Sequence, residues 1–123
     1  MTALIRSKLL IANPASSPIP GGEILIEDRR ISAIGAAGEI DLPADCEVID
    51  CTQYAVMPGL IDSHAHITAN NKYPGSVRDH YLLDLATAVL RGSMNLRDDL
   101  ATGVTTMRTL GDRDGVERSF RDA

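Results

Sequence analysis

The stretch that decides the fold is Ala55-Val56-Met57-Pro58-Gly59-Leu60-Ile61-Asp62-Ser63-His64-Ala65-His66. Its first eight residues are mostly apolar and predict a buried strand. Pro58 stands near the start of that strand, because proline cannot donate a hydrogen bond to a sheet ladder. Side chains two residues apart on a strand point to the same side, so the imidazoles of His64 and His66 can converge on one divalent cation. The alternative is that both histidines are structural.

The segment after this motif predicts a strand, a helix and a second strand. A polar loop over residues 68–78 leads into a helical period over residues 77–101, which Ser76 or Asp79 would cap. Gly103 suits the position just after the helix, and a β-branched strand follows over residues 104–110. The apolar stripe that we expect on the buried face of the helix comprises Leu82, Leu85, Ala86, Val89, Leu90, Leu96 and Leu100. Residues 112–115 predict a turn and residues 116–123 the beginning of another helix, so the pattern is that of a parallel βαβ unit.

The segment before the motif predicts a small β-layer built from hairpins. Residues 3–11 form a short apolar strand and are followed by a turn-rich connection. Residues 23–27 and 31–34 alternate around the polar turn Asp28-Arg29-Arg30, which is a hairpin pattern. Residues 47–51 predict a further short strand.

Composition narrows the class of protein. The chain has 123 residues and a formal charge of −5, with 44% hydrophobic and 24% charged residues, which is typical of a soluble globular protein. It is too short for a complete eight-stranded α/β barrel, which needs roughly 250 residues. The acidic balance without blocks of Lys or Arg argues against nucleic acid and membrane partners. Cys46 and Cys51 match neither a redox nor a zinc spacing, and no signal or membrane segment is present, so we expect reduced thiols in a cytoplasmic protein.

The motif itself resembles a known family. The run from Val56 to His66 is similar to the first-strand signature of the metal-dependent amidohydrolase superfamily, Pro-Gly-[Leu/Phe]-[Ile/Val]-Asp-x-His-x-His. The preceding hairpins resemble the small β-sandwich of that family, and residues 103–111 resemble its second barrel strand. With Arg121-Asp122-Ala123 following, the chain looks most like the branch of Xaa-Pro dipeptidase-like and metallo-carboxypeptidase enzymes.

The resemblance implies an α/β fold in two parts. Residues 1–55 would form part of a β-sandwich. Residues 56–123 would begin a (β/α)8 TIM-type barrel, with strand 1, helix 1, strand 2 and the beginning of helix 2, and this barrel is incomplete in the chain. The implied function is the N-terminal portion of a hydrolase similar to imidazolonepropionase or Xaa-Pro dipeptidase. Such an enzyme cleaves amide or peptide C–N bonds of a small-molecule or peptide substrate through a metal-activated water.

The resemblance also implies roles for individual residues. His64 and His66 match the two ligands of the more buried metal, usually zinc, in a centre of one or two divalent ions. Asp62 matches a carboxylate that orients the ligands or supports the structure rather than binding the metal. Arg108 ends the second strand, where it would line the substrate pocket or form a structural salt bridge. The other catalytic residues are not identified by the sequence.

Several family ligands have no counterpart in the chain. The family uses a carboxylated lysine, two further histidines and an aspartate from later strands, whereas Lys8 and Lys72 follow no suitable strand. His80 stands at the start of the predicted helix and is expected to be solvated. We therefore expect the 123 residues alone to be inactive, and to self-associate or oligomerise through uncovered barrel edges. The alternative is a non-catalytic binding or assembly protein built on the same scaffold.

Overall fold

The chain folds into a mixed α/β structure with two sheets. The computed structural model describes residues 2–69, 78–79 and 82–123. Its internal contacts divide the chain into two compact units, residues 1–58 and residues 59–123. Each unit has its own sheet.

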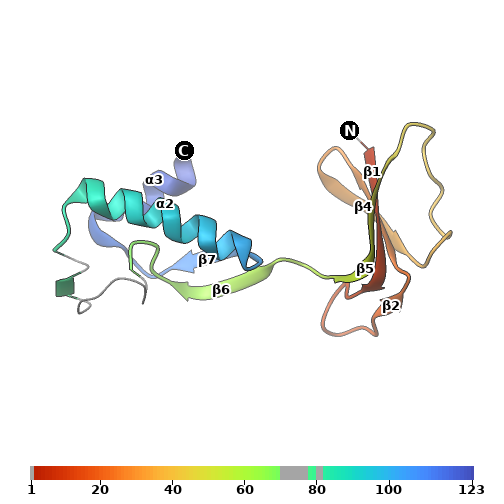
Figure 1. Ribbon diagram of the computed structural model, residues 1–123, viewed down its shortest axis with the longest axis horizontal. Coiled ribbons are helices and arrows are strands. Elements are labelled where there is room, and N and C mark those ends of the chain that lie inside the picture. Colours follow the sequence, from red (N-terminus) through yellow and green to blue (C-terminus); the bar gives the residue numbers. More distant parts are fainter. Residues whose placement is uncertain (1, 70–77, 80–81) are drawn as a thin grey trace. The chain divides into compact units, whose positions relative to one another are not determined.

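Five strands form the sheet of the first unit, and they are β1 (Thr2–Leu10), β2 (Ile19–Pro20), β3 (Glu23–Glu27), β4 (Arg30–Gly35) and β5 (Glu47–Val56). Strand β1 pairs antiparallel with β2 and β3, and β3 pairs antiparallel with β4 (Figure 1). Leu4 and Leu10 on β1 have side chains that are completely buried. The strand predicted over residues 3–11 is thereby confirmed as β1, which is the central strand of this sheet.

The predicted hairpin is confirmed as β3 and β4, with a tighter turn than expected. Glu27 pairs with Arg30, so only Asp28 and Arg29 lie in the turn. Both have positive φ, 48° and 64°, as the two central residues of a tight hairpin turn require. Aspartate tolerates this backbone region, whereas Arg29 adopts it at a steric cost.

The expectation that hairpins build the whole layer is wrong for β5. This strand pairs in parallel with β1, from Ala3 opposite Glu47 to Leu10 opposite Val56. It is also twice as long as the strand predicted over residues 47–51. Parallel partners are joined by a long crossover rather than by a tight turn, so no local turn signal identifies the partner of β5.

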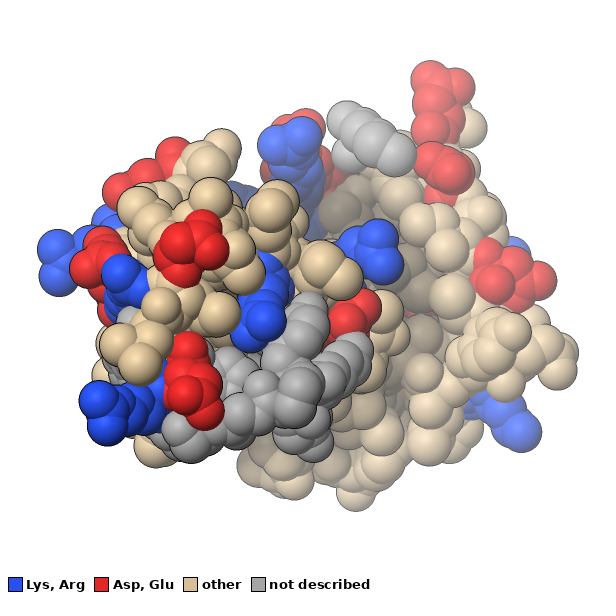
Figure 2. All heavy atoms as spheres, turned by 60° about the vertical axis from the view of Figure 1, so that its left-hand side comes forward, with Lys and Arg blue, Asp and Glu red and all other residues tan. Residues whose placement is uncertain are grey.

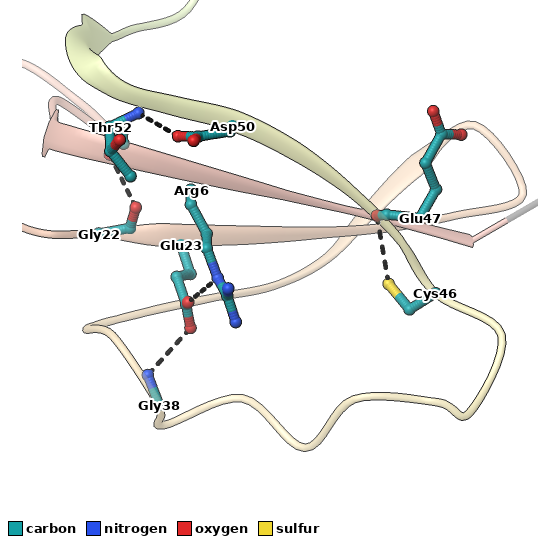
Figure 3. Close-up of polar contacts among 9 residues, drawn as sticks. Arg6, Gly22, Glu23, Gly38, Cys46, Glu47, Asp50 and Thr52 are labelled. Atoms are coloured by element: carbon teal, nitrogen blue, oxygen red, sulfur yellow. Dashed lines mark hydrogen bonds and ion pairs between the residues drawn. The ribbon is translucent and has the colours of Figure 1, made fainter.

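A buried carboxylate links the two central strands to the loop after β4. Glu23 is 4% exposed and accepts two hydrogen bonds, one at each carboxylate oxygen. The Nε atom of Arg6 donates to Oε1 at 3.0 Å, and the backbone N–H of Gly38 donates to Oε2 at 3.0 Å (Figure 3). Both oxygens are therefore satisfied, which a buried carboxylate requires.

The predicted single strand over residues 55–62 is wrong in two respects. The run is divided between β5, which ends at Val56, and β6 (Leu60–Ala65), with Pro58 between them. It is also not buried, because Leu60 is 48% and Ile61 is 71% exposed. A continuous apolar run signals a strand without revealing what covers it, and among the described residues β6 pairs with β7 alone.

The second unit is a strand–helix–strand unit followed by a short helix. Its remaining elements are α2 (Leu85–Ala101), β7 (Val104–Thr109), the 3-10 turn η1 (Arg113–Gly115) and α3 (Val116–Asp122). Strands β6 and β7 are parallel, and α2 connects them (Figure 1). The predicted βαβ unit and the helix after residue 115 are therefore confirmed. No helix in the described part of the chain has the length and apolar character needed to cross a bilayer.

The helix ends where the sequence predicted and begins later than expected. Thr102 is its C-cap and Gly103 follows with φ +95°, which confirms the predicted glycine stop. The N-cap is Asp84, whose carboxylate accepts a hydrogen bond from the backbone N–H of Thr87 at 3.0 Å. Of the two predicted caps, Asp79 does not cap α2, because it lies with residue 78 in a helical segment that precedes α2. Ser76 lies outside the described residues.

The predicted buried face of α2 is wrong. The buried residues of the helix are Ala88, Gly92 and Asn95, whereas Leu85 is 50% and Leu90 is 68% exposed. Small residues allow the helix to approach its neighbours closely. A Cβ atom added at Gly92 would lie 2.9 Å from the ring of Phe120 and 3.7 Å from the carbonyl oxygen of Ile67. Close approach of the backbone therefore decides which face is buried.

Candidate metal centre at the end of strand β6

His64 and His66 lie at the carboxyl end of β6. His64 belongs to the strand, and His66 follows its last residue, Ala65. The two ring centroids are 5.6 Å apart and the ring planes are inclined by 64°. Both side chains are exposed and line the same pocket, which has a volume of about 270 Å³. The structure therefore brings the two histidines together beside one cavity.

The ring of His66 is oriented by a backbone carbonyl. Its Nδ1 atom lies 2.8 Å from the carbonyl oxygen of Gly111, which follows β7 by two residues. A carbonyl oxygen can only accept, so Nδ1 carries the proton in this contact. The lone pair of the neutral ring then resides on Nε2, which is the arrangement found in metal-binding histidines whose other nitrogen donates to a carbonyl.

Asp112, which directly follows Gly111 in the chain, holds the backbone after His66. One of its carboxylate oxygens accepts from the backbone N–H of Ile67 at 3.1 Å. The other accepts from the backbone N–H of Thr68 at 3.0 Å and from the hydroxyl of Thr68 at 2.7 Å. On the opposite side, the amide nitrogen of Asn95 donates to the carbonyl oxygen of Ile67 at 2.8 Å. The loop after β6 is thus connected to both the end of β7 and helix α2.

The other predicted site residues have different surroundings. Asp62 lines the pocket, and its Oδ1 atom accepts from the backbone N–H of His64 at 3.0 Å. Arg108 is exposed on β7 and does not line this pocket, so its role in substrate binding stays a prediction. His80 lies outside the described residues.

Three polar residues of the pocket were missed by sequence reasoning, and all belong to α2. Asn95, Asp98 and Asp99 line the pocket together with the histidines and Asp62. Asn95 had one available signal, since it is a polar residue within the helical period, and it is only 4% exposed. Asp112 also had a signal, because it directly follows a parallel strand at the end where α/β proteins place their sites.

The side chains that line this pocket fit part of a metal centre. Two neighbouring imidazoles are ligands that Zn²⁺ accepts, and the carboxylates of the pocket favour a cation. Over residues 2–69, 78–79 and 82–123, no group of three or more His, Cys, Asp or Glu side chains has the geometry to hold a metal ion. The described residues therefore bring together two candidate ligands, and a complete centre would need more.

Charge on the surrounding surface is mixed. On the face shown in Figure 2, Lys and Arg side chains are interspersed with Asp and Glu over the second unit. No broad patch of one sign covers the second unit on this face.

Comparison with known proteins identifies the relatives of this chain. No family model matches it. An imidazolonepropionase from Geobacillus sp. (strain WCH70) is 32% identical over 82 residues, which are 63% of this chain and 18% of that protein. An enamidase from Eubacterium barkeri is 28% identical over 103 residues, which are 83% of this chain and 23% of that protein. The chain therefore spans about a fifth of the length of the curated relatives it matches.

The solved structures agree with this relationship. A crystal structure of a Xaa-Pro dipeptidase with bound methionine in its active site superposes with a TM-score of 0.80 at 24% identity. The superposition covers 100% of this chain and 30% of the dipeptidase. At this identity the likeness concerns the fold. The resemblance noted in the sequence is confirmed: the chain is similar in sequence to part of an imidazolonepropionase and of an enamidase, as expected for the N-terminal portion of an amidohydrolase, and it has a fold of the Xaa-Pro dipeptidase type.

Proposed function

We propose that this chain supplies His64 and His66 as two metal ligands of a hydrolase that acts on amide or peptide C–N bonds. The observation that supports this most directly is the contact between His66 Nδ1 and the carbonyl oxygen of Gly111. That contact leaves Nε2 of His66 free beside the ring of His64, facing the same pocket.

The proposed scaffold has two parts. Residues 1–55 would be a portion of a β-sandwich, and residues 56–123 would begin a (β/α)8 barrel. In such a barrel the active site lies at the carboxyl ends of the strands, which is where His64 and His66 stand. Asp62 supports the site by accepting the backbone N–H of His64 rather than by binding the metal. Arg108 is proposed as a further residue near the substrate.

The proposed cofactor is a divalent metal, most simply zinc, as one or two ions. When bound, such a metal lowers the pKa of a coordinated water toward about 7 and supplies a hydroxide nucleophile at neutral pH. The chain's own histidines hold the ion, and the acidic pocket residues Asp98 and Asp99 lower the cost of placing a cation there. Asn95 keeps the loop after β6 in place.

The names of the relatives support the substrate class. One is a dipeptidase for Xaa-Pro substrates, and another is an enamidase. We therefore propose a small molecule or peptide with a hydrolysable C–N bond as the substrate, in a cytoplasmic protein.

The 123 residues alone would not complete the centre. A tetrahedral zinc site takes four ligands, and two imidazoles leave two positions to be filled. We therefore expect weak metal binding and no hydrolysis by this chain alone. The free edges of the sheet formed by β6 and β7, with Leu60 and Ile61 exposed, would also promote self-association.

A second candidate function is a non-catalytic binding or assembly role. The observation that favours it is that the described residues bring together only two metal-binding side chains. We prefer the hydrolase, because the two imidazoles lie beside each other at one pocket and the His66–Gly111 contact leaves Nε2 of His66 as the available lone pair.

The experiment combines metal analysis with activity assays. Purified protein is freed of metal with a chelator, titrated with Zn²⁺, and tested on Xaa-Pro dipeptides and cyclic amides. A longer protein that contains this sequence should bind Zn²⁺ stoichiometrically and hydrolyse one of these classes, whereas the 123-residue chain should not turn over. Stoichiometric metal binding without any hydrolysis would favour the second candidate, and robust turnover by the 123 residues would contradict the incomplete centre.

A further inference from the structure

We propose that Asp112 is the positioning residue for His66. It would hold the peptide after His66 so that the imidazole keeps Nδ1 on the carbonyl oxygen of Gly111 and presents Nε2 to a metal. The metal-binding part of this inference rests on the function proposed above. The orientation of the ring can be tested without it.

One carboxylate organises three donors from two consecutive residues. Asp112 accepts from the backbone N–H groups of Ile67 and Thr68, at 3.1 and 3.0 Å, and from the Thr68 hydroxyl at 2.7 Å. Hydrogen bonds to an ionised acceptor are about twice as strong as those between neutral groups. Ile67 and Thr68 are both buried, at 4% and 5% exposure, so these donors have little access to water as an alternative partner.

The backbone N–H of Ile67 is the group through which Asp112 restrains the backbone of His66. The N–H of Ile67 belongs to the peptide plane that joins it to His66, so fixing this group fixes the backbone of His66 at its carboxyl side. The carbonyl oxygen of Ile67 is fixed from the opposite direction by Asn95, at 2.8 Å. On the other side of His66, the carbonyl oxygen of Ala65 accepts from the backbone N–H of Leu110 at 3.2 Å. The backbone of His66 is thus restrained on both sides.

Gly111 and Asp112 act as one unit, because they are adjacent in the chain. The carbonyl oxygen of Gly111 accepts a hydrogen bond from the His66 ring, while the carboxylate of Asp112 accepts hydrogen bonds from the backbone N–H groups that follow His66. Two adjacent residues after β7 therefore hold both the ring of His66 and the backbone that follows it. A change at Asp112 would move the loop relative to the Gly111 carbonyl, and the ring would lose its acceptor.

The test uses two substitutions and a matched control. Asp112→Ala removes all three acceptor contacts. Asp112→Asn keeps one oxygen for Thr68 but places an amide donor against the N–H of Ile67. Asp114→Asn is the control, because Asp114 lies in the same loop and is exposed, and its carboxylate pairs with Arg113 rather than with the loop after β6.

The first readout is the ¹⁵N NMR signature of the His66 ring at a pH where the ring is neutral. In the unchanged protein and in Asp114→Asn we expect the tautomer protonated at Nδ1. In Asp112→Ala we expect a mixture of tautomers, and in Asp112→Asn a smaller shift in the same direction. Amide hydrogen exchange at Ile67 and Thr68 should become faster in both variants.

The second readout is the dissociation constant for Zn²⁺, measured on a protein that contains this whole sequence and binds the metal. Removing a group that orients a metal ligand typically weakens affinity 10- to 100-fold, and we expect this range for Asp112→Ala and less for Asp112→Asn. Faster amide exchange with an unchanged His66 tautomer and unchanged zinc affinity would overturn the proposal, because Asp112 would then support only the loop. If no form of the protein binds Zn²⁺, the proposed metal site fails, while the ring signature still decides whether Asp112 positions His66.

Should Asp112→Ala fail to fold, Asp112→Asn decides the question with the same two readouts. Circular dichroism of each variant shows whether it folds, and only folded variants are compared with the unchanged protein. A folded Asp112→Asn protein with the ring signature of the unchanged protein would also overturn the proposal.

Discussion

The Nδ1 atom of His66 lies 2.8 Å from the carbonyl oxygen of Gly111, which is 45 residues further along the chain. This contact joins the loop after β6 to the loop after β7, and so it connects the ends of two parallel strands. Because the carbonyl can only accept, the contact selects the tautomer of the ring. The orientation of one candidate ligand is therefore a property of two distant segments together.

Removing either histidine of the pair should weaken metal binding strongly. In a protein that binds zinc through this motif, we expect His64→Ala or His66→Ala to weaken Zn²⁺ affinity at least about 100-fold, because each removes a direct ligand. The matched control is His80→Ala, which removes a histidine that stands outside the motif. Equilibrium dialysis with metal analysis measures the effect. Equal zinc affinity in all three variants would exclude the pair as ligands.

Replacing Gly111 should affect the site as well as the backbone. Gly111 has φ +104° and no atom within 4 Å of an added Cβ, so Gly111→Ala strains the backbone without a clash. We expect a loss of roughly 1–3 kcal/mol in unfolding free energy. Gly38→Ala is the control, since Gly38 has φ +79° and equally open surroundings in the other unit. Urea unfolding should show similar losses for both variants, whereas only Gly111→Ala should change the ¹⁵N signature of the His66 ring.

The first unit should depend on the charge of Glu23. In Glu23→Gln, one of the two donors, Arg6 or the backbone of Gly38, would face an amide NH₂ instead of an oxygen. We expect a loss of about 1–3 kcal/mol, which is the typical cost when a buried partner of a charged hydrogen bond is lost. Glu27→Gln, an exposed glutamate on the same strand, should change stability little. Similar midpoints of urea unfolding for the two variants would show that the buried carboxylate contributes nothing.

The start of β6 should require a glycine at position 59. A Cβ atom added there would lie 2.7 Å from the Cβ of Thr105, and it would be closer still to both γ atoms of that side chain. We expect Gly59→Ala to cost about 1–3 kcal/mol through overpacking. Thr105→Gly removes the obstructing atoms, so the double variant should lose less than the two single variants combined. Strict additivity of the three unfolding free energies would contradict this account.

Helix α2 should lose stability in acid through its N-cap. The hydroxyl and then the backbone N–H of Thr87 donate to Asp84 and hold its pKa below the ordinary value of 3.8. A lowered folded-state pKa stabilises the fold above the unfolded value and loses that contribution as the pH falls through the folded-state pKa. The unchanged helix should therefore weaken below about pH 4.

The corresponding variant is Asp84→Asn, which keeps a good N-cap but cannot titrate. Hydrogen exchange at the amides of the first turn of α2 measures the effect between about pH 5 and pH 3. The acid-dependent loss of protection, corrected for the intrinsic exchange rate, should be smaller in Asp84→Asn than in the unchanged protein. A control is Asp45→Asn, an exposed aspartate of the first unit, which should leave the α2 profile unchanged.

Local sequence patterns predicted the elements that depend on neighbouring residues. The hairpin of β3 and β4 follows from two alternating runs around Asp28 and Arg29. The end of α2 follows from Gly103, whose positive φ suits glycine. The His64–His66 spacing identified the candidate ligands and, with the preceding Pro-Gly run, the family. Each of these features lies within a few residues of its own signal.

Tertiary structure decided the features that depend on distant residues. The parallel pairing of β5 with β1 could not be predicted, because no tight turn connects them. The buried face of α2 was predicted incorrectly, because helical periodicity defines a stripe but not the surface that covers it, and close approach selected Ala88, Gly92 and Asn95.

The same division applies to the candidate site. The sequence by itself determined which two imidazoles stand at the end of β6. Only the tertiary structure brought Gly111 and Asp112 to His66 and its loop, and so decided which nitrogen carries the proton. The physical reason is that the two segments lie 45 residues apart, and the parallel pairing of β6 with β7 brings their carboxyl ends to the same edge of the sheet.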